Sequence, residues 1–310
     1  MRVFVAGASG VIGRPLVRQL VAAGHDVVGM TSREAGLQAI RDAGGEGVVC
    51  DALDADAVGP AVASARPEVV INQLTRLPRE YDPRKIDYEP TNRARTEGGR
   101  NLIRAAVAAG ARRFITQGIA FIYAPEGDMV KDEEARPWTD APEPFGGGAK
   151  AMVEHEKEAI GTPGLEGLVL RYGQFYGPGT YYASDGNIAE QVRKRRFPIV
   201  GRGEAVFSFI HVEDAASATV ASLERGAPGI YNVVDDEPAP LRVWLPVYAE
   251  ALGAKRPFRV PVFLARLVAG PFAAAFASGL RGASNAKAKR KLGWQPRNSS
   301  WRQGFREALG

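Results

Sequence analysis

The sequence of 310 residues has a single cysteine, Cys50, and only three histidines. One thiol cannot form an internal disulfide and cannot supply the several sulfur ligands of a structural zinc site, so both kinds of cross-link are excluded. We expect Cys50 to be a small buried apolar residue, and we predict no metal site. The sequence begins directly with an apolar run and a glycine turn, without the pattern of a secretory signal, which favours a cytoplasmic protein.

The sequence also lacks an uninterrupted apolar run long enough to predict a membrane span. Its longest apolar stretch, residues 261–280, is broken by Arg266, Gly270 and Pro271. We therefore expect two short apolar helices on either side of Gly270 and Pro271, and no membrane span. A peripheral contact with a membrane is the alternative.

The formal net charge of +5 is low, and acidic and basic residues alternate along most of the chain. Basic clusters occur only at residues 193–196 and 287–291, and neither contains the aromatic residues that a single-strand nucleic-acid binder needs. We expect no nucleic-acid partner. The positive excess is compatible with a small-molecule substrate that is acidic or phosphorylated.

A glycine-rich turn follows the first apolar run of the chain, residues 3–6. Gly7 permits a tight turn out of a strand, Gly10 allows backbone amides to approach a pyrophosphate, and Gly13 allows the next helix to pack closely. The helical stretch 14–23 then presents its positive N-terminus to the phosphates. This order of strand, turn and helix predicts a dinucleotide-binding site with these residues: Gly7, Ser9, Gly10, Val11, Ile12 and Gly13.

Apolar runs bounded by turn residues recur along the chain and alternate with helical patterns, notably 14–23 and 93–109. Alternating strands and helices require right-handed crossovers, which produce a parallel sheet. The predicted fold is therefore α/β, a Rossmann-type doubly wound parallel sheet. Its strands are expected at residues 3–6, 26–30, 47–50, 69–72, 113–117, 165–170 and 229–233.

Two regions interrupt this alternation. Residues 124–148 are rich in proline, glycine and acidic residues, and we expect a long loop there. From Tyr176 onward the pattern is mixed. We expect residues 1–175 to form the dinucleotide-binding Rossmann domain, which also receives residues 205–235. Residues 176–204 and 236–310 are expected to form a small C-terminal substrate-binding subdomain over the carboxyl edge of the sheet.

Beyond the glycine turn, several further motifs follow one another along the chain in the order that is typical of one protein family. They are Asp51 after the third strand and the stretches 170–179 (LRYGQFYGPG), 209–214 (FIHVED), 231–233 (YNV) and 291–296 (KLGWQP). Together they resemble the extended short-chain dehydrogenases/reductases, the superfamily of sugar-nucleotide epimerases and dehydratases. The resemblance covers nearly the whole chain. It implies a nicotinamide cofactor and an oxidoreductase or epimerase-like activity.

The end of the second strand indicates which nicotinamide cofactor is bound. Selective binders of NAD carry an acidic residue there for the ribose hydroxyls, whereas this chain has Ser32 and Arg33, which can donate hydrogen bonds to a 2′-phosphate. We expect NADP, with NAD as the alternative. By resemblance, Asp51 holds the adenine amino group. The resemblance also implies further cofactor contacts at Ala52, Leu74, Thr75, Thr116 and Lys150.

The catalytic residues of the family are incomplete in this sequence. Relatives use a Tyr-x-x-x-Lys pair on one helix face, in which the tyrosine exchanges a proton with the substrate and the lysine lowers the pKa of the tyrosine. By resemblance, Lys150 aligns with the lysine, but Gly146 stands where the tyrosine would be. The run Gly146-Gly147-Gly148 is expected to be a mobile or closely approached loop.

Two other family positions are also altered. Ile119 stands in place of the usual serine or threonine, and Ala120-Phe121 stands in place of the Asp-Glu pair of dehydratases. None of these side chains can move a proton, so conventional dehydration is not expected. Arg95 aligns with a family asparagine; it either binds an anionic group beside the cofactor or is simply exposed.

The remaining catalytic candidates are Lys150, Gln117, Tyr123, Tyr176, Tyr181, Tyr182 and His211. Lys150 can donate a proton if burial lowers its pKa, and Gln117, at the end of the fifth strand, can hydrogen-bond a substrate carbonyl. Tyr123 and Tyr176 occupy family motif positions near the cleft, although each can equally be a packed aromatic residue. His211 is expected to be structural.

These observations leave three functions open. The first is an atypical NADP-dependent oxidoreductase or epimerase-like enzyme that acts on a small carbonyl or alcohol. The second is a redox-silent isomerase, cyclase or lyase on the same scaffold, and the third is a noncatalytic nucleotide-sensing protein. By resemblance we also expect a homodimer, formed through residues 93–109 and the helix after Lys150.

Overall fold

Seven parallel strands form one sheet in this computed structural model, which describes residues 1–78, 82 and 87–309. The strand order is β12-β7-β5-β4-β1-β2-β3, the doubly wound arrangement that the alternating pattern predicted. Every predicted strand of this sheet is present, within a few residues of its expected bounds. The strands are β1 (Arg2–Ala6), β2 (Asp26–Thr31), β3 (Glu46–Val49), β4 (Val69–Asn72), β5 (Arg113–Ile119), β7 (Glu166–Tyr172) and β12 (Gly229–Val233).

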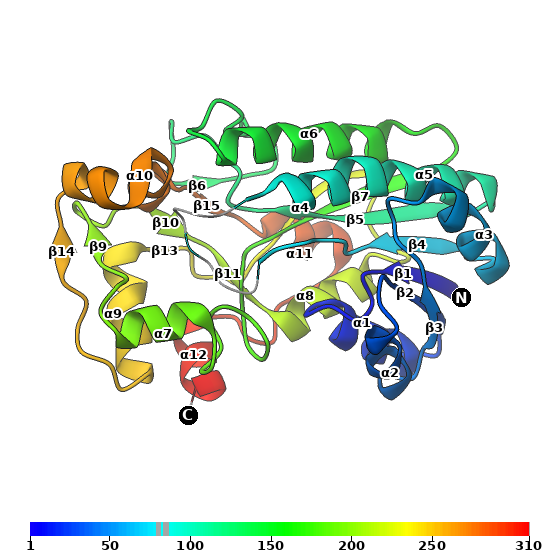
Figure 1. The fold of residues 1–310 in the computed structure, drawn as a ribbon, viewed down its shortest axis with the longest axis horizontal. Helices are drawn as coiled ribbons and strands as arrows, with labels where there is room; N and C mark the ends of the chain where they lie inside the picture. Colours follow the sequence, from blue (N-terminus) through cyan, green and yellow to red (C-terminus); the bar gives the residue numbers. More distant parts are fainter. Residues whose placement is uncertain (79–81, 83–86, 310) are drawn as a thin grey trace.

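Helices cover both faces of the sheet (Figure 1). Strand side chains such as Phe4 and Ile71 are fully buried between these layers. This burial on both faces explains why the strands have continuous apolar sequences. One face carries α1 (Gly13–Ala22), α2 (Ala35–Asp42) and α8 (Val212–Ala221). The other carries α3 (Ala55–Ala65), α5 (Gly99–Ala108) and α6 (Phe145–Gly161).

The helix predicted over 93–109 is not continuous. It consists of α4 (Glu89–Arg93), a π-helical turn η1 (Ala94–Gly98) and then α5. A π-helical turn changes the direction in which side chains leave the helix, and such turns are frequent at functional sites. Here the turn contains Arg95.

The prediction of one long loop over residues 124–148 was wrong in two places. Strand β6 (Val130–Lys131) pairs in parallel with β15 (Gly282–Ala283), far along the chain. Helix α6 begins at Phe145, so the three glycines belong to its first turns and not to a loop. A Cβ atom on Gly146 would collide with the backbone oxygen of Ala141, which explains at least this glycine by close packing.

The later parts of the chain build a second hydrophobic cluster at one end of the sheet, away from α2 and α3 (Figure 1). It includes the fully buried side chains of Trp244, Trp301 and Phe305. Its helices are α7 (Asn187–Arg193), α9 (Leu241–Ala251) and α12 (Trp301–Leu309); α11 (Ala286–Leu292) packs beside β12. Short pairs complete it: β8 (Gln174–Tyr176) with β11 (Phe209–His211), β9 (Ile199–Val200) with β14 (Arg259–Val260), and β10 (Val206–Phe207) with β13 (Ala239–Pro240).

The apolar stretch near residue 270 forms α10 (Val262–Gly279), which is two helices joined at a kink. Gly270 has φ 87° and ψ 167°, outside the helical region, and Pro271 follows it, as the sequence predicted. Among the described residues, α10 is the one helix long and apolar enough to cross a membrane by length and composition. The kink divides it into halves that are each too short to span a bilayer.

Candidate active site

The glycine turn after β1 has the geometry that a bound pyrophosphate needs. Gly7 has φ +81°, and a Cβ atom there would lie 2.7 Å from the backbone oxygen of Gln73. A Cβ atom on Gly13 would collide with the backbone of Gly7 and Ala8. No described side chain caps α1 at Ile12. The Arg14 amide donates to the backbone oxygen of Gly10 and Pro15 has no N–H, so the Gly13 amide is the group at the start of α1 that is available to an anion.

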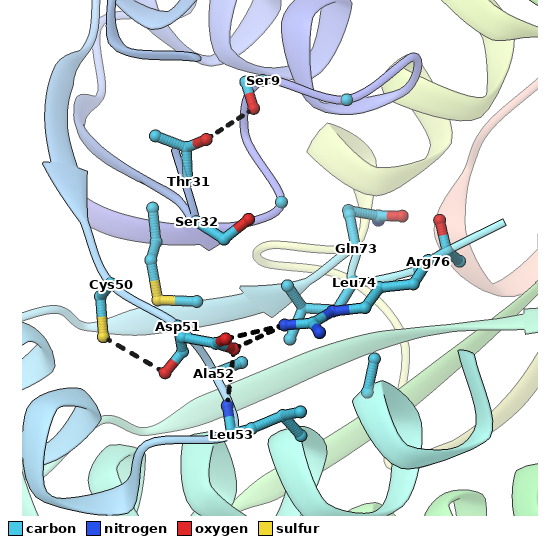
Figure 2. Close-up of a pocket in the computed structure, with 15 residues that line it drawn as sticks. Ser9, Thr31, Ser32, Cys50, Asp51, Ala52, Leu53, Gln73, Leu74 and Arg76 are labelled. Carbon is cyan, nitrogen blue, oxygen red and sulfur yellow. Dashed lines mark hydrogen bonds and ion pairs between the residues drawn. The ribbon is translucent and has the colours of Figure 1, made fainter. Parts of the chain in front are cut away.

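A small cavity of about 150 Å³ opens beside this turn at the carboxyl ends of the strands (Figure 2). The Asp51 carboxylate lies 2.7 and 2.9 Å from Nη2 of Arg76. A hydrogen bond from the backbone N–H of Leu53, together with Arg76, lowers the pKa of Asp51. The expected cofactor residues that line this cavity are Gly7, Ser9, Gly10, Ser32, Asp51, Ala52, Leu74 and Thr75.

Sequence reasoning missed Arg76 and misplaced Thr116, while the role of Arg33 stays a prediction. Arg76 lines the cavity, and a basic residue just after β4 was the available signal. Arg33 is exposed and does not line either described cavity. The prediction that Thr116 contacts the cofactor was wrong. Thr116 is fully buried, and its Oγ1 lies 2.8 Å from Nε2 of His155 in α6. Its side chain therefore faces α6 and cannot reach a cofactor.

A much larger cavity of about 1460 Å³ continues from the same turn. Gly7, Gly10, Gln73 and Thr75 border both cavities, so the two form one cleft along the carboxyl edge of the sheet. The predicted residues Val11, Ile12, Gly13 and Gln117 line this larger part. Gln117 donates a hydrogen bond from Nε2 to the backbone oxygen of Leu74 at 2.8 Å, which holds its amide at the cleft wall.

Helix α6 presents Gly148 and Met152, together with Phe145, to the large cavity. Positions four residues apart lie on one face of a helix, so Gly148 and Met152 face the cleft together with the spacing of a Tyr-x-x-x-Lys pair. These two positions lie two residues after Gly146 and Lys150, the positions expected from the sequence. Lys150 is exposed and is not among the described residues that line the cleft, so it cannot serve as the predicted proton donor or ribose contact.

A buried ion pair fixes this register of α6. Glu156, four residues after Met152, accepts hydrogen bonds from Nε and Nη2 of Arg171 in β7 at 2.9 and 2.6 Å. Both side chains are at most 3% exposed. Because a buried charge without its partner is costly, this pair holds the face of α6 that carries Met152 toward the cleft.

The two tyrosine candidates are also corrected. Tyr123 is fully buried and donates a hydrogen bond to Oδ1 of Asn232 at 2.6 Å, while it accepts one from Arg171 at 3.2 Å. Burial raises the pKa of Tyr123 to about 12. Tyr176 is fully buried against Phe305, and burial raises its pKa as well. Neither side chain lines a described cavity, so both are packing residues.

Arg95 is not exposed, which was one of the two alternatives that the sequence left open. It is 8% exposed and lines the large cavity from the π-helical turn η1. Much of the remaining wall is aromatic, with Phe121, Phe145 and Phe276 in contact with one another. Residues of α10, including Leu264 and Val268, extend this apolar wall. The cleft therefore combines an apolar interior with one deep positive group.

The strand order, the glycine turn and the cleft at the carboxyl edge define a dinucleotide-binding α/β protein. The sequence matches the description "NAD dependent epimerase/dehydratase family" over residues 3–233. The chain belongs to this family, as the resemblance implied.

Similarity to individual proteins extends over nearly the whole chain. A "3-diazoavenalumate denitrifying reductase" of a Streptomyces species is 47% identical, over 98% of this chain and 99% of that protein. A "2-alkyl-3-oxoalkanoate reductase" of Stenotrophomonas maltophilia is 27% identical, over 83% of this chain and 77% of that protein. The UDP-glucose 4-epimerase of Thermus thermophilus, solved with NAD, is 25% identical over 100% of this chain and 98% of its own, with a TM-score of 0.73. These relatives support a nicotinamide-dependent oxidoreductase or epimerase-like enzyme.

Proposed function

We propose that the protein is a nicotinamide-dependent reductase whose acceptor needs no proton from a tyrosine. The observation that carries this proposal is the pair of residues on the cleft face of α6, where Gly148 and Met152 stand in place of an acid and its partner. A glycine and a thioether cannot exchange protons at neutral pH. Reduction is retained as the reaction class because two relatives over most of this chain are named reductases.

The residues of the cleft suit the cofactor that this function requires. The amides of the glycine turn and the start of α1 would hold the pyrophosphate, and Asp51 and Ser32 would line the adenosine end. When bound, the reduced nicotinamide supplies a hydride. We propose NADP as the cofactor, because Ser32 and the cation of Arg76 line the adenosine cavity and can donate to a 2′-phosphate.

A diazo compound is the acceptor class that fits a cleft to which α6 presents no proton donor at Gly148 and Met152. Replacement of a diazonium group by hydrogen consumes one hydride and releases dinitrogen, and its atoms and charges balance without a proton. A carbonyl acceptor, by contrast, develops an alkoxide that needs a proton donor. The 47% identical relative is named for a diazo substrate and a denitrifying reduction. Within this proposal, the role of the chain is to bind the acceptor against the apolar wall of the cleft and to position it.

The experiment that tests the proposal compares two acceptors of the same shape. Diazotised 4-aminocinnamate and 4-formylcinnamate are each mixed with the protein and NADPH, and NADPH oxidation and dinitrogen release are measured against protein-free mixtures. We expect one NADPH oxidised for each dinitrogen released from the diazonium acid, and background rates with the aldehyde. Faster reduction of the aldehyde contradicts the proposal. Conversion of either compound without NADPH oxidation would favour the redox-silent alternative.

A noncatalytic nucleotide sensor is the other function that the sequence left open. A cavity of about 1460 Å³ continuous with the cofactor cavity argues against it, since a sensor of nucleotide state has no need of a second, larger cleft.

A further inference from the structure

Arg95 is a buried guanidinium that the described parts of the protein do not neutralise. Its side chain is 8% exposed and lines the large cavity. Among the described residues it has no ion pair, and its buried Nε atom has no hydrogen-bond partner. A buried donor left without a partner is costly, so its presence in a cleft points to a partner that arrives with the ligand.

Arg95 stays cationic at neutral pH in this environment. Burial lowers its pKa to about 10, still well above neutral, and the nearby groups Tyr88 and Glu156 act in the opposite direction. Glu156 does not neutralise it, because both carboxylate oxygens of Glu156 are bonded to Arg171. The positive charge inside the cleft is therefore available to an anion.

We propose that Arg95 binds the carboxylate of the substrate, and that the substrate is an aromatic carboxylic acid. This inference rests on the proposed reductase function and names the substrate class of the same cleft. The planar guanidinium can donate two parallel hydrogen bonds to a carboxylate, which fixes orientation as well as charge.

The aromatic part of the substrate follows from the walls around Arg95. Tyr88, which lines the same cavity as Arg95, packs edge-on against Phe272 with the ring centroids 6.5 Å apart. Phe272 stacks on Phe145 at 5.9 Å, and Phe145 contacts Phe276 at 5.8 Å. Faces and edges of such rings favour another aromatic ring. An acid group held at Arg95 therefore places a conjugated ring against Phe145 and Phe276.

Arg196 provides a matched comparison, because it is a second guanidinium that lines the same cavity. Unlike Arg95, it is exposed to solvent. A guanidinium in water competes with hydration for any carboxylate and contributes little to binding. Comparison of variants of Arg95 and Arg196 therefore distinguishes binding at a buried anion site from attraction by the general positive charge of the cleft.

The test measures the binding of cinnamate and of its neutral analogue cinnamamide to the NADP-loaded protein by isothermal titration calorimetry. We expect the wild-type protein to bind cinnamate at least about tenfold more tightly than cinnamamide. Arg95→Gln is expected to abolish this preference, and Arg196→Gln is expected to retain it. Arg95→Lys, which keeps the charge and loses the paired donors, is expected to retain part of it.

Three results would overturn the inference. They are an equal affinity of the wild-type protein for the acid and the amide, an unchanged preference in Arg95→Gln, and a loss of NADPH affinity in Arg95→Gln with cinnamate affinity retained. The last result would make Arg95 a cofactor ligand. The wild-type comparison can overturn the inference even if Arg95→Gln does not fold, and Arg196→Gln and Arg95→Lys then assign any preference to one of the two arginines.

This binding test does not depend on turnover, so it separates the two proposals. A protein that prefers cinnamate through Arg95 and reduces no diazonium acid would retain the anion site and refute the reductase proposal. A protein that reduces the diazonium acid equally well after Arg95→Gln would retain the reductase function and refute the role of Arg95.

Discussion

Met152 lies one helical turn after Gly148 in α6, and both residues face the large cavity. This relationship defines the register of α6, which presents neither a tyrosine nor a lysine to the cleft at these two positions. Lys150 lies between them in sequence but is exposed. At these two positions α6 therefore offers the cleft no proton-transfer group. This register of α6 and its neighbouring contacts lead to predictions about stability, activity and pH dependence.

Two glycines of α6 are expected to respond oppositely to the same substitution. A Cβ atom on Gly148 meets Oδ1 of Asn92 at an ordinary 3.5 Å, so Gly148→Ala should raise the free energy of unfolding by about 0.5–1 kcal/mol. A Cβ atom on Gly146 collides with the backbone of Ala141, so Gly146→Ala should lower it by about 1–3 kcal/mol. Urea denaturation of both variants measures the difference. Equal effects of the two substitutions would contradict the described register.

Lys150→Ala should leave turnover and NADPH affinity within about twofold of the wild-type values, because the exposed ammonium contributes little to a site it does not reach. Lys157→Ala, which removes another exposed lysine of the same helix, is the matched control. Steady-state kinetics and a nucleotide titration measure both quantities. A loss of NADPH affinity above tenfold in Lys150→Ala alone would restore its assignment as a ribose contact.

Tyr123→Phe should reduce stability without reducing turnover per folded molecule. Its hydroxyl bonds Asn232 and Arg171 inside the protein, so removal leaves a buried acceptor unpaired and should cost about 1–3 kcal/mol of unfolding free energy. Thermal denaturation measures the first quantity, and kinetics normalised to folded protein measure the second. A drop in normalised kcat above tenfold would indicate that Tyr123 takes part in the chemistry.

His155 should make the protein less stable in mild acid. Burial, followed by the charges of Arg95 and Arg100, lowers the pKa of His155 to about 4, below its ordinary value of 6.5. The unfolded chain therefore binds a proton that the folded protein excludes, so stability falls as pH falls from about 6.5 to about 4 and is constant above that range. The loss should be on the order of 3 kcal/mol. In His155→Gln this part of the pH dependence should be absent, which denaturation at a series of pH values can test.

The sequence predicted the sheet and the glycine turn because both depend on local patterns. Apolar runs specify buried parallel strands, and Gly7 and Gly13 leave no space for a side chain. The face of α6 depends instead on a distant ion pair between Glu156 and Arg171. In the sequence, Lys150 matched the lysine of the family motif. In the structure, packing of α6 turns Gly148 and Met152 toward the cleft and leaves Lys150 exposed.

The same reasoning explains the other differences. Whether Tyr176 faces a cleft or a core depends on Phe305, which lies at the far end of the chain and could not be placed from the sequence. The π-helical turn that directs Arg95 inward has no clear signature in composition or spacing. Arg95 could be named from the sequence, but its burial could not.

The most direct test of the central claim is the fate of the transferred hydrogen. The protein is supplied with NADPH deuterated at both nicotinamide C4 positions and with diazotised 4-aminocinnamate in ordinary water, and the product is analysed by mass spectrometry and NMR. The proposal predicts cinnamate with one deuterium at the ring carbon that carried the diazonium group. Cinnamate with hydrogen from solvent at that carbon, formed at a rate above the protein-free background, would contradict hydride transfer in this cleft.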